Sequence, residues 1–416
     1  MSITTDSCQY GAESCPLVLT SILINMINIR MKWLTSAEAL TLLGGRRQTL
    51  YANVSRGRIR AKPDPKDSRR SLYHGGDVET LAVRRAGRRT VATVAANAID
   101  WGDPVLASSI STVVDGRLWY RGRDAIELAQ VATLEEIAEL LWEISSVSFR
   151  SSKLERLSEP TLPLRAALRA LAKHAADDPP PFGRSRPALA AESSGLVSEI
   201  AAAMLGTADV TNPMHCRIAV AWGVDKAEDV FRRALVLLAE HELNPSTFAV
   251  RVTASTGAPA AACLLSGLGT LAGPLHGGAA AQMKALTELV ARDGAARAVR
   301  DWLAQGRPIP AFGHPLYPDG DPRAAALLAA FELVPCHAEL ATVIEDVTGE
   351  KPNIDFALAA LRDSFGLPDS APLTLFAIAR SVGWVAHLME QATSGALIRP
   401  RARYNGPPLE KPMREK

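Results

Sequence analysis

The stretch Gly273-Pro-Leu-His276-Gly-Gly-Ala279 places a histidine in a glycine-flanked turn directly before an Ala-rich segment. The composition of that segment predicts a helix over about 279–292. Glycines on both sides of the histidine allow a ligand to approach the backbone closely. The positive field of a helix N-terminus disfavours imidazolium, so His276 is expected to be a neutral hydrogen-bond donor to an oxygen that gains charge.

A second rigid loop, Pro310-Ala-Phe-Gly-His314-Pro-Leu-Tyr317, is followed six residues later by Arg323. A histidine and an arginine this close suit an anionic substrate with a carbonyl group, because one polarises the carbonyl and the other pairs with a carboxylate. Asn353-Ile-Asp355-Phe then places a carboxylate between apolar neighbours. Burial there would raise the pKa of Asp355 and make it a stronger base.

The three motifs, taken in this order, resemble the citrate synthase family. Further likenesses are His241-Glu-Leu-Asn-x-Ser-Thr-Phe248, the run Ala379-Arg-Ser-Val-Gly-Trp-x-Ala-His-x-x-Glu-Gln391, and Arg399-Pro-Arg401 with the following Tyr404. The resemblance covers about residues 91–416, and it implies an all-α fold with a large helical domain and a small subdomain at about 277–375. It also implies a homodimer, with the active site in the cleft between the two parts.

The resemblance implies condensation of an acyl-CoA, typically acetyl-CoA, with oxaloacetate, followed by hydrolysis of the thioester to citrate and CoA. Asp355 would take a proton from the thioester methyl group, His276 would hydrogen-bond the enolate oxygen, and His314 would polarise the oxaloacetate ketone. The residues implied to hold the substrate carboxylates are His241, Arg323, Arg380 and, from a second copy of the chain, Arg399. No metal or organic cofactor is implied, since CoA is part of a substrate.

Two departures from the family pattern concern CoA. Pro315 and Pro318 stand where the family has basic residues. Weaker contacts to the CoA phosphates are therefore expected, whereas the carboxylate-binding set is complete. Trp384 and His387 are interpreted as helix packing, and His215 is left as a structural residue.

The N-terminal part has a different character. Residues 31–90 contain 14 Lys and Arg against five Asp and Glu, although the net charge of the whole chain is only +2. Thr35-Ser-Ala-Glu38 fits a capping box, and two short helices, the second over about 46–55, would flank Gly44-Gly45. A basic hairpin would follow, and then a third helix capped by Asp77.

This arrangement resembles the winged helix-turn-helix domain of mercury-resistance regulators and excisionases. The resemblance implies that the outer face of the second helix enters a DNA groove while the hairpin meets phosphates. The residues implied to contact DNA are Arg46, Arg47, Gln48, Tyr51, Arg58 and Arg70. The alternative is a small docking module that binds no DNA.

Composition sets the remaining expectations. The chain has 416 residues, of which 47% are hydrophobic and 5% aromatic, which favours a multidomain helical protein and excludes a disordered one. Its five scattered cysteines show no metal-ligand spacing and indicate reduced thiols in the cytoplasm. No apolar run reaches the roughly 18 residues of a membrane span. Residues 1–30 are expected to be a non-functional extension before Met31, with a cleaved signal as the alternative.

Two other functions remain open. One additional methylene changes binding by only about 1–3 kcal/mol, so a 2-methylcitrate synthase that uses propionyl-CoA is the close alternative. The alternative from a different class is a DNA-binding regulator whose synthase-like body senses oxaloacetate or CoA. Retention of Asp355, His276 and His314 together favours catalysis, because a sensor needs no base.

Overall fold

The computed structural model describes residues 33–43, 47–55, 58–65, 67–85, 106–149, 162–207, 211–402, 404 and 406–407. The described residues belong to two compact units, one within residues 1–105 and 403–416 and the other over Leu106–Ala402. Residues 1–32, including the expected extension, and Arg46 lie outside the described residues.

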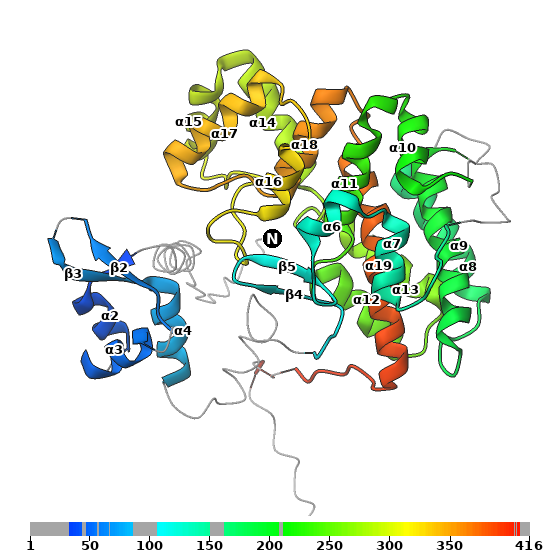
Figure 1. Cartoon of the computed structure of the whole chain (residues 1–416), viewed down its shortest axis with the longest axis horizontal. Coiled ribbons are helices and arrows are strands. Elements are labelled where there is room, and N and C mark those ends of the chain that lie inside the picture. Colours follow the sequence, from blue (N-terminus) through cyan, green and yellow to red (C-terminus); the bar gives the residue numbers. More distant parts are fainter. Residues whose placement is uncertain are drawn as a thin grey trace, which may run out of the picture. The chain divides into compact units, whose positions relative to one another are not determined.

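The first unit is a small three-stranded sheet with three helices (Figure 1). Its elements are β1 (Trp33–Leu34), α2 (Ser36–Leu43), α3 (Arg47–Ser55), β2 (Ala61–Asp64), β3 (Asp67–His74) and α4 (Gly75–Arg85). The sheet is antiparallel with the order β1-β3-β2. Its core contains Leu34, Ala39, Leu43, Leu50, Ile59, Tyr73 and Val78.

Local sequence signals explain the ends of these elements. The predicted capping box is present, since Glu38 N donates to Thr35 Oγ1 at 3.3 Å and Thr35 N donates to Glu38 Oε2 at 2.7 Å. The prediction that Asp77 caps the third helix is wrong, because α4 begins at Gly75. Asp77 instead accepts hydrogen bonds from the backbone and side chain of Arg60, and the contacts with His74 and Arg60 hold the pKa of Asp77 well below its ordinary value despite burial.

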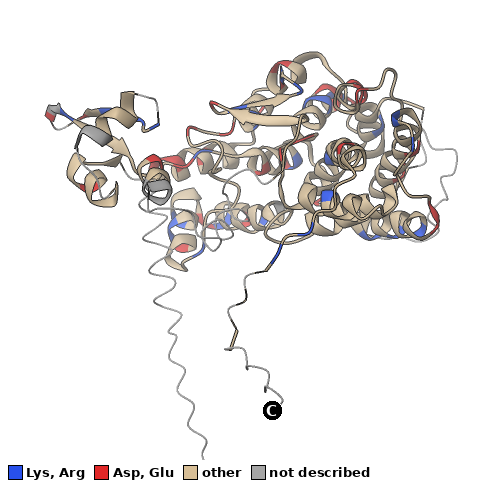
Figure 2. Ribbon diagram, turned by 90° about the horizontal axis from the view of Figure 1, so that it is seen from below, with Lys and Arg blue, Asp and Glu red and all other residues tan. Residues whose placement is uncertain are grey.

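The second unit is a helical assembly, as the sequence predicts, around a long buried helix, α19 (Ala371–Ser394). The elements around α19 are α6 (Ala125–Val131), α7 (Leu134–Trp142), α8 (Pro163–Asp177), α9 (Arg186–Leu205), α10 (Met214–Trp222), η1 (Asp225–Ala227), α11 (Glu228–Leu238), α12 (Pro245–Ser255) and α13 (Ala260–Leu271). The Ala- and Leu-rich stretches at about 189–205, 225–241 and 373–392 predict helices, and these correspond to α9, α11 and α19. Acidic and basic residues are interspersed along this unit (Figure 2).

A second, smaller core lies beside the first. It is formed by α14 (Ala279–Asp293), α15 (Ala295–Ala304), α17 (Pro335–Thr348) and one face of α18 (Ile354–Phe365). The opposite face of α18 and the short α16 (Pro322–Leu328) contribute to the main core. Because α18 belongs to both cores, residues at its first turn lie at the junction (Figure 1).

One sequence prediction for this unit is wrong. The spacing of apolar residues predicts a helix from Tyr120 to Ala129, but its first half contains the end of β5 (Arg117–Tyr120) and the whole of β6 (Arg123–Asp124). With β4 (Ser111–Val114) these strands form a small antiparallel sheet. Burial alternates along β5, as in a strand. Arg121 and Gly122 then have left-handed backbone conformations, which a helix would not allow. The helix α6 begins only after Asp124, whose carboxylate caps it.

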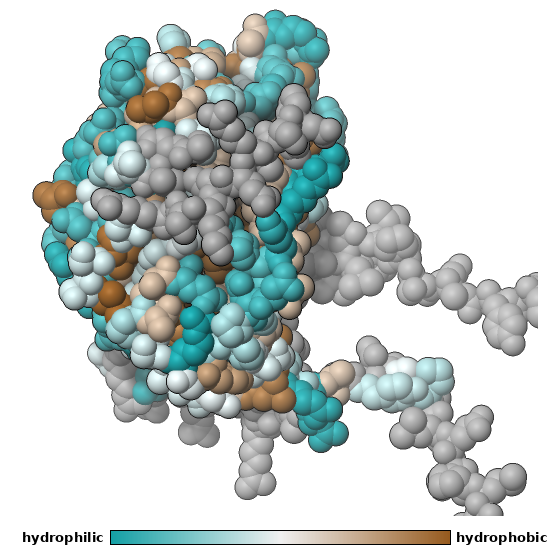
Figure 3. Space-filling model, turned by 90° about the vertical axis from the view of Figure 1, so that its right-hand side faces the viewer, coloured by the Kyte–Doolittle hydropathy of each residue, from teal (hydrophilic) through white to brown (hydrophobic). Residues whose placement is uncertain are grey.

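Within the part of the chain that the structure describes, two helices, α9 and α19, are long and apolar enough to cross a membrane by length and composition alone. In α19, however, 89% of the apolar window is buried inside the protein, as in the core helix of a helical bundle. Figure 3 views the side on which α8, α9 and α10 lie in Figure 1, and its coloured atoms show hydrophilic and apolar residues intermixed.

Gly383 allows α19 to approach the end of α11 closely. A Cβ atom at this position would lie 2.2 Å from Glu240 Oε2 and 2.4 Å from the Ala239 carbonyl oxygen. We expect Gly383→Ala to lower the free energy of unfolding by about 1–3 kcal/mol, because backbone must move to relieve the overlap. Urea denaturation of Gly269→Ala is the matched control. A Cβ there, in α13, meets nothing within 4 Å, and this change should be neutral or stabilising by up to about 1 kcal/mol. Equal effects of the two changes would contradict the packing argument.

Candidate active site

The loop that carries His314 is joined to the start of α18 by backbone hydrogen bonds. Gly313 N donates to Lys351 O at 2.9 Å, and Asn353 N donates to Ala311 O at 3.0 Å. The Asn353 side chain completes the link, because its Nδ2 donates to Gly313 O at 3.0 Å while its Oδ1 accepts the N–H of Asp355 at 3.0 Å. This one asparagine caps α18 and fixes the His314 loop against the turn that carries Asp355.

His314 is held as a neutral ring with its proton on Nε2. The Nδ1 atom accepts the N–H of Leu316 at 3.2 Å, so the proton resides on the other nitrogen. Burial, reinforced by the positive charge of Arg323, lowers the pKa of His314 to about 4. The ring therefore offers a hydrogen-bond donor at neutral pH.

His241 lies edge-on to His314, with ring centroids 5.1 Å apart. Its Nε2 shares a 2.8 Å hydrogen bond with the hydroxyl group of Tyr317. Burial and the nearby Arg323 lower the pKa of His241 well below its ordinary value, so it too is neutral. Two neutral imidazoles and a tyrosine therefore lie in contact with one another beside the guanidinium group of Arg323.

Two arginines are almost completely buried around these rings. Arg323 forms a bidentate pair with Asp321, with Nε–Oδ1 at 3.0 Å and Nη2–Oδ2 at 2.8 Å, which leaves Nη1 as the nitrogen that Asp321 does not use. Arg380, on α19, donates from Nε to Leu238 O at 2.9 Å. Burial lowers the pKa of Arg380, whereas in Arg323 the Asp321 carboxylate outweighs burial and raises it. Buried guanidinium groups at a cleft are suited to bind carboxylates.

His276 lies in the glycine turn before α14, as the sequence predicts. A Cβ atom at Gly277 would lie 2.2 Å from Leu271 O, so the turn requires glycine there. His276 Nε2 lies 3.0 Å from Ser246 Oγ, which also accepts the indole N–H of Trp384 at 3.2 Å. Burial, with a contribution from Arg380, lowers the pKa of His276 to about 4.

The Ser246 hydroxyl has one proton and two possible acceptors, His276 Nε2 and Asn244 Oδ1, the latter at 2.7 Å. When the hydroxyl donates to Nε2, the imidazole proton resides on Nδ1, where a ligand can accept it. When it donates to Asn244, Nε2 keeps the proton. The orientation of this hydroxyl therefore selects the tautomer of His276.

Asp355 faces a small pocket lined by Gly277, Leu358, Pro372, Leu373 and Phe376. The ring of Phe376, which lines this pocket, also contacts His276, with centroids 6.3 Å apart, and Arg380 acts on the pKa values of both His276 and Asp355. Burial raises the pKa of Asp355 to about 6, although Arg323 and Arg380 act in the opposite direction. A carboxylate with this pKa is ionised at neutral pH and is a stronger base than an exposed one.

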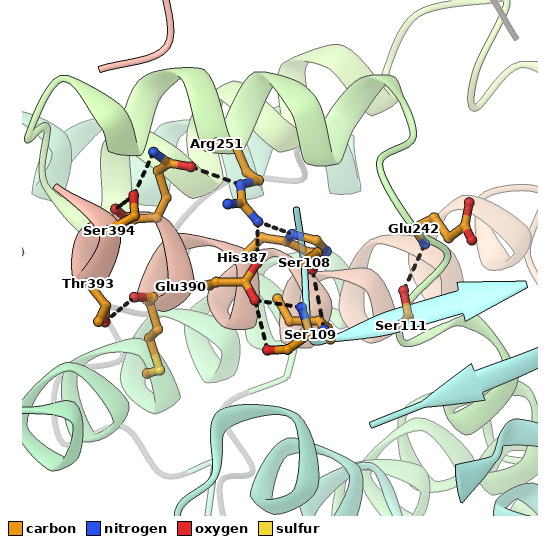
Figure 4. Close-up of polar contacts among 12 residues, drawn as sticks. Ser108, Ser109, Ser111, Glu242, Arg251, His387, Glu390, Thr393 and Ser394 are labelled. Atoms are coloured by element: carbon orange, nitrogen blue, oxygen red, sulfur yellow. Dashed lines mark hydrogen bonds and ion pairs between the residues drawn. The ribbon is translucent and has the colours of Figure 1, made fainter. Parts of the chain in front are cut away.

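A polar network holds the turn that precedes His241 (Figure 4). Arg251 Nη1 lies 3.2 Å from His387 Nδ1 and also pairs with Glu390, whose Oε1 accepts Ser109 N–H at 2.8 Å. Since Arg251 can only donate, His387 Nδ1 is the acceptor, and its Nε2–H donates to Glu240 Oε1 at 3.0 Å. The residue next to His241 is thereby anchored to α12 and α19.

Comparison with known proteins agrees with this geometry. The family model described as "Citrate synthase, C-terminal domain" matches residues 149–401. "Citrate synthase 2" of Bacillus subtilis is 34% identical over 351 residues, which cover 73% of this chain and 94% of that protein. The chain belongs to the citrate synthase family.

Two further relatives span a similar part of the chain. "2-methylcitrate synthase 1" of Corynebacterium glutamicum is 29% identical over 355 residues, covering 72% of this chain and 92% of that protein. The crystal structure of citrate synthase from Thermotoga maritima has 27% sequence identity and a TM-score of 0.62, and covers 74% of this chain and 96% of that one. Both agree with a citrate synthase fold.

The structure brings six of the seven residues expected at the citrate synthase site together: His241, His276, His314, Arg323, Asp355 and Arg380. Arg399 is instead exposed, beyond the end of α19. Sequence reasoning did not assign Asp321, Ser246 or Tyr317, although all three stand within the quoted motifs. Trp384 and His387 do pack within the core, but each also donates a hydrogen bond that supports a site residue.

The residues expected to contact DNA are only partly described. Tyr51, Arg58 and Arg70 are exposed on the first unit, as expected for contact residues. Arg47 and Gln48 lie on α3, but their side chains, like the whole of Arg46, are outside the described part of the chain.

The raised pKa of Asp355 predicts a pH-dependent stability difference. Above pH 6 the folded protein carries a buried charge that Asp355→Asn removes, so the variant should be the more stable protein. Between pH 6 and about 4 the folded wild type binds a proton that its unfolded chain does not, and the difference should shrink. Thermal denaturation of the wild type and of Asp355→Asn across this pH range measures the difference in stability between them. Asp319→Asn, at an exposed carboxylate of the His314 loop, should show no such trend, and a constant difference for Asp355→Asn would contradict the burial of its charge.

Proposed function

We propose that this chain condenses acetyl-CoA with oxaloacetate and hydrolyses the thioester to release citrate and CoA. The observation that carries the proposal is that a carboxylate of raised pKa, two neutral histidines with lowered pKa values and two buried arginines lie close enough for the arginines to act on the pKa values of the other three. Few reactions need a base, two neutral hydrogen-bond donors and a carboxylate clamp together. Removal of a proton next to a thioester carbonyl and attack of the enolate on a keto acid need all of them.

In the first step Asp355 removes a proton from the methyl carbon of the thioester. The developing enolate oxygen accepts a hydrogen bond from His276 Nδ1 in the tautomer for which Ser246 donates to Nε2. A neutral donor suits this position because it stabilises the negative oxygen without requiring a protonated imidazole in a buried, positively charged surrounding.

In the second step the enolate carbon attacks the oxaloacetate ketone. His314 donates from Nε2 to the ketone oxygen, which becomes an alkoxide and then a hydroxyl. Arg323, Arg380 and His241 bind the oxaloacetate carboxylates, and Arg399 joins them from a second copy of the chain. The exposure of Arg399 in a single copy supports this homodimer.

The close alternative is 2-methylcitrate synthesis from propionyl-CoA. The pocket beside Asp355 has apolar walls in Leu358, Leu373 and Phe376, the surroundings that an additional methyl group on the reacting carbon would require. The similarity to a 2-methylcitrate synthase fits both readings, so the product has to be measured.

The decisive experiment is mass spectrometry of the products formed from oxaloacetate with acetyl-CoA or propionyl-CoA. We expect citrate as the main product, and a loss of about 10²–10⁴ in kcat for Asp355→Ala with oxaloacetate affinity nearly unchanged, because the base is not a carboxylate ligand. His314→Ala is the negative control, and sedimentation velocity confirms the dimer. Absence of product from either thioester with a folded dimer would refute the enzyme, and unchanged turnover in Asp355→Ala would refute the assigned base.

For the first unit we propose a winged helix-turn-helix that binds duplex DNA. The order α2-α3 followed by the β2-β3 hairpin, with β1 completing the sheet, supports this assignment. The exposed Tyr51 on α3 and the exposed Arg58 and Arg70 around the hairpin are available for contacts. A fused synthase body would then link DNA occupancy to the supply of oxaloacetate or CoA.

Electrophoretic mobility shifts with duplex DNA and a salt titration test this proposal. Arg58→Ala and Arg70→Ala should each weaken binding and reduce the salt slope by about 1, since each removes one phosphate contact. Arg297→Ala, an exposed arginine of the second unit, should change neither quantity. No retardation at low salt would favour the docking module instead.

A further inference from the structure

A cluster of metal-binding side chains lies apart from the active site, where α10 meets α11. His215 and Cys216 belong to the first turn of α10, and Glu228 is the first residue of α11. One potential ligand atom from each residue, a ring nitrogen, a thiol sulfur and a carboxylate oxygen, lies within 4.8 Å of the other two. The scattered cysteines gave no such indication in the sequence, because the cluster is assembled across two helices.

In this cluster, His215 has a buried ring nitrogen that lacks a hydrogen-bond partner among the described residues. The residue is 8% exposed, and its Nδ1 has no hydrogen-bond partner in the described part of the chain. Its Nε2 lies 3.6 Å from Glu228 Oε1, beyond hydrogen-bond distance. A buried imidazole nitrogen without a hydrogen-bond partner is unusual, and its lone pair is stabilised when it binds a metal ion.

A second carboxylate increases the negative charge around this cluster. Glu135 accepts the N–H of Met214 at 2.8 Å with Oε1, while its buried Oε2 has no partner among the described residues. Arg232, whose charge acts on His215, is bound to Asp229 and to the carbonyl oxygens of Ala129 and Ala132. The donors of Arg232 are therefore used by other acceptors, and a small cation would meet the carboxylates of Glu228 and Glu135.

We propose that His215, Cys216 and Glu228 bind a divalent zinc ion. Imidazole, thiolate and carboxylate are the ligand types that zinc combines, and in a tetrahedral site they lie about 3.3–3.8 Å from one another. Small side-chain rotations from the present separations reach that geometry. The thiol of Cys216 releases its proton to solvent on binding, and a water molecule completes the tetrahedron. With one thiolate and one carboxylate the complex is neutral, which suits a half-buried position.

The ion would join the starts of α10 and α11 across the turn that contains η1. Glu228 is about half exposed, so the ion can enter from solvent. A bound zinc ion would stabilise this corner of the large domain and would take no part in the condensation. The proposal is independent of the proposed function, and its tests do not use enzyme activity.

The test is titration of chelator-treated full-length protein with Co²⁺ and with Zn²⁺. We expect one equivalent of Co²⁺ to produce a thiolate charge-transfer band and tetrahedral visible bands, and zinc to displace it and to raise the melting temperature. Cys216→Ser should abolish the charge-transfer band and weaken zinc binding by about 100-fold or more. Cys336→Ser removes another partly exposed thiol and should leave the charge-transfer band and the zinc affinity unchanged.

Alkylation provides a second measurement that needs no variant. Zinc should protect Cys216 from iodoacetamide in the wild-type protein, as read by peptide mass spectrometry, whereas Cys336 in the same sample should react equally with and without zinc. Cobalt binding without a charge-transfer band, binding that persists in Cys216→Ser, or alkylation of Cys216 unaffected by zinc would each overturn the proposal.

Discussion

The buried ion pair between Asp321 and Arg323 determines how the two sides of the site meet. Asp321 caps α16 through the N–H of Arg323, binds the guanidinium of the same residue, and accepts the N–H of Ile354 at 3.1 Å. One carboxylate thus joins α16 to the first residue of α18. Removing one member of such a pair leaves an uncompensated buried charge, at a cost of about 3–5 kcal/mol. The pair therefore fixes the position of Asp355, one residue further along α18, as well as that of the arginine.

The remaining site residues are attached to two different parts of the second unit. Asp355 and the His314 loop are connected through Asn353 and move with α18, which is packed into both hydrophobic cores. His276 and Arg380 are fixed instead to the large core, through Ser246 and the Leu238 carbonyl. The distance from the base to His276 therefore depends on how α18 is packed between the two cores.

Motifs made of special backbone residues were the most informative part of the sequence. The glycine turn at His276 and the loop of His314 were predicted because glycine and proline limit the local conformation, whereas the start of α18, capped by Asn353, was not predicted. Partners distant in the chain could not be predicted in this way. The Glu240–His387–Arg251 network joins residues more than 130 positions apart, and nothing local indicates that Ser246 selects the tautomer of His276. The strands around Tyr120 were predicted as helix because a helix does follow, and only the left-handed turn at Arg121 and Gly122 separates the two.

The charges of the site suggest how one substrate prepares it for the other. In the unliganded protein Arg323 and Arg380 lower the pKa of Asp355, in opposition to burial. When the carboxylates of oxaloacetate pair with these guanidinium groups, as proposed, their positive field at Asp355 is largely cancelled while the burial persists. The pKa of Asp355 then rises further, and the carboxylate becomes a stronger base once the electrophile is in place. Deprotonation of the thioester is thereby favoured in the ternary complex over the complex with acyl-CoA alone, which limits formation of an enolate that has nothing to attack.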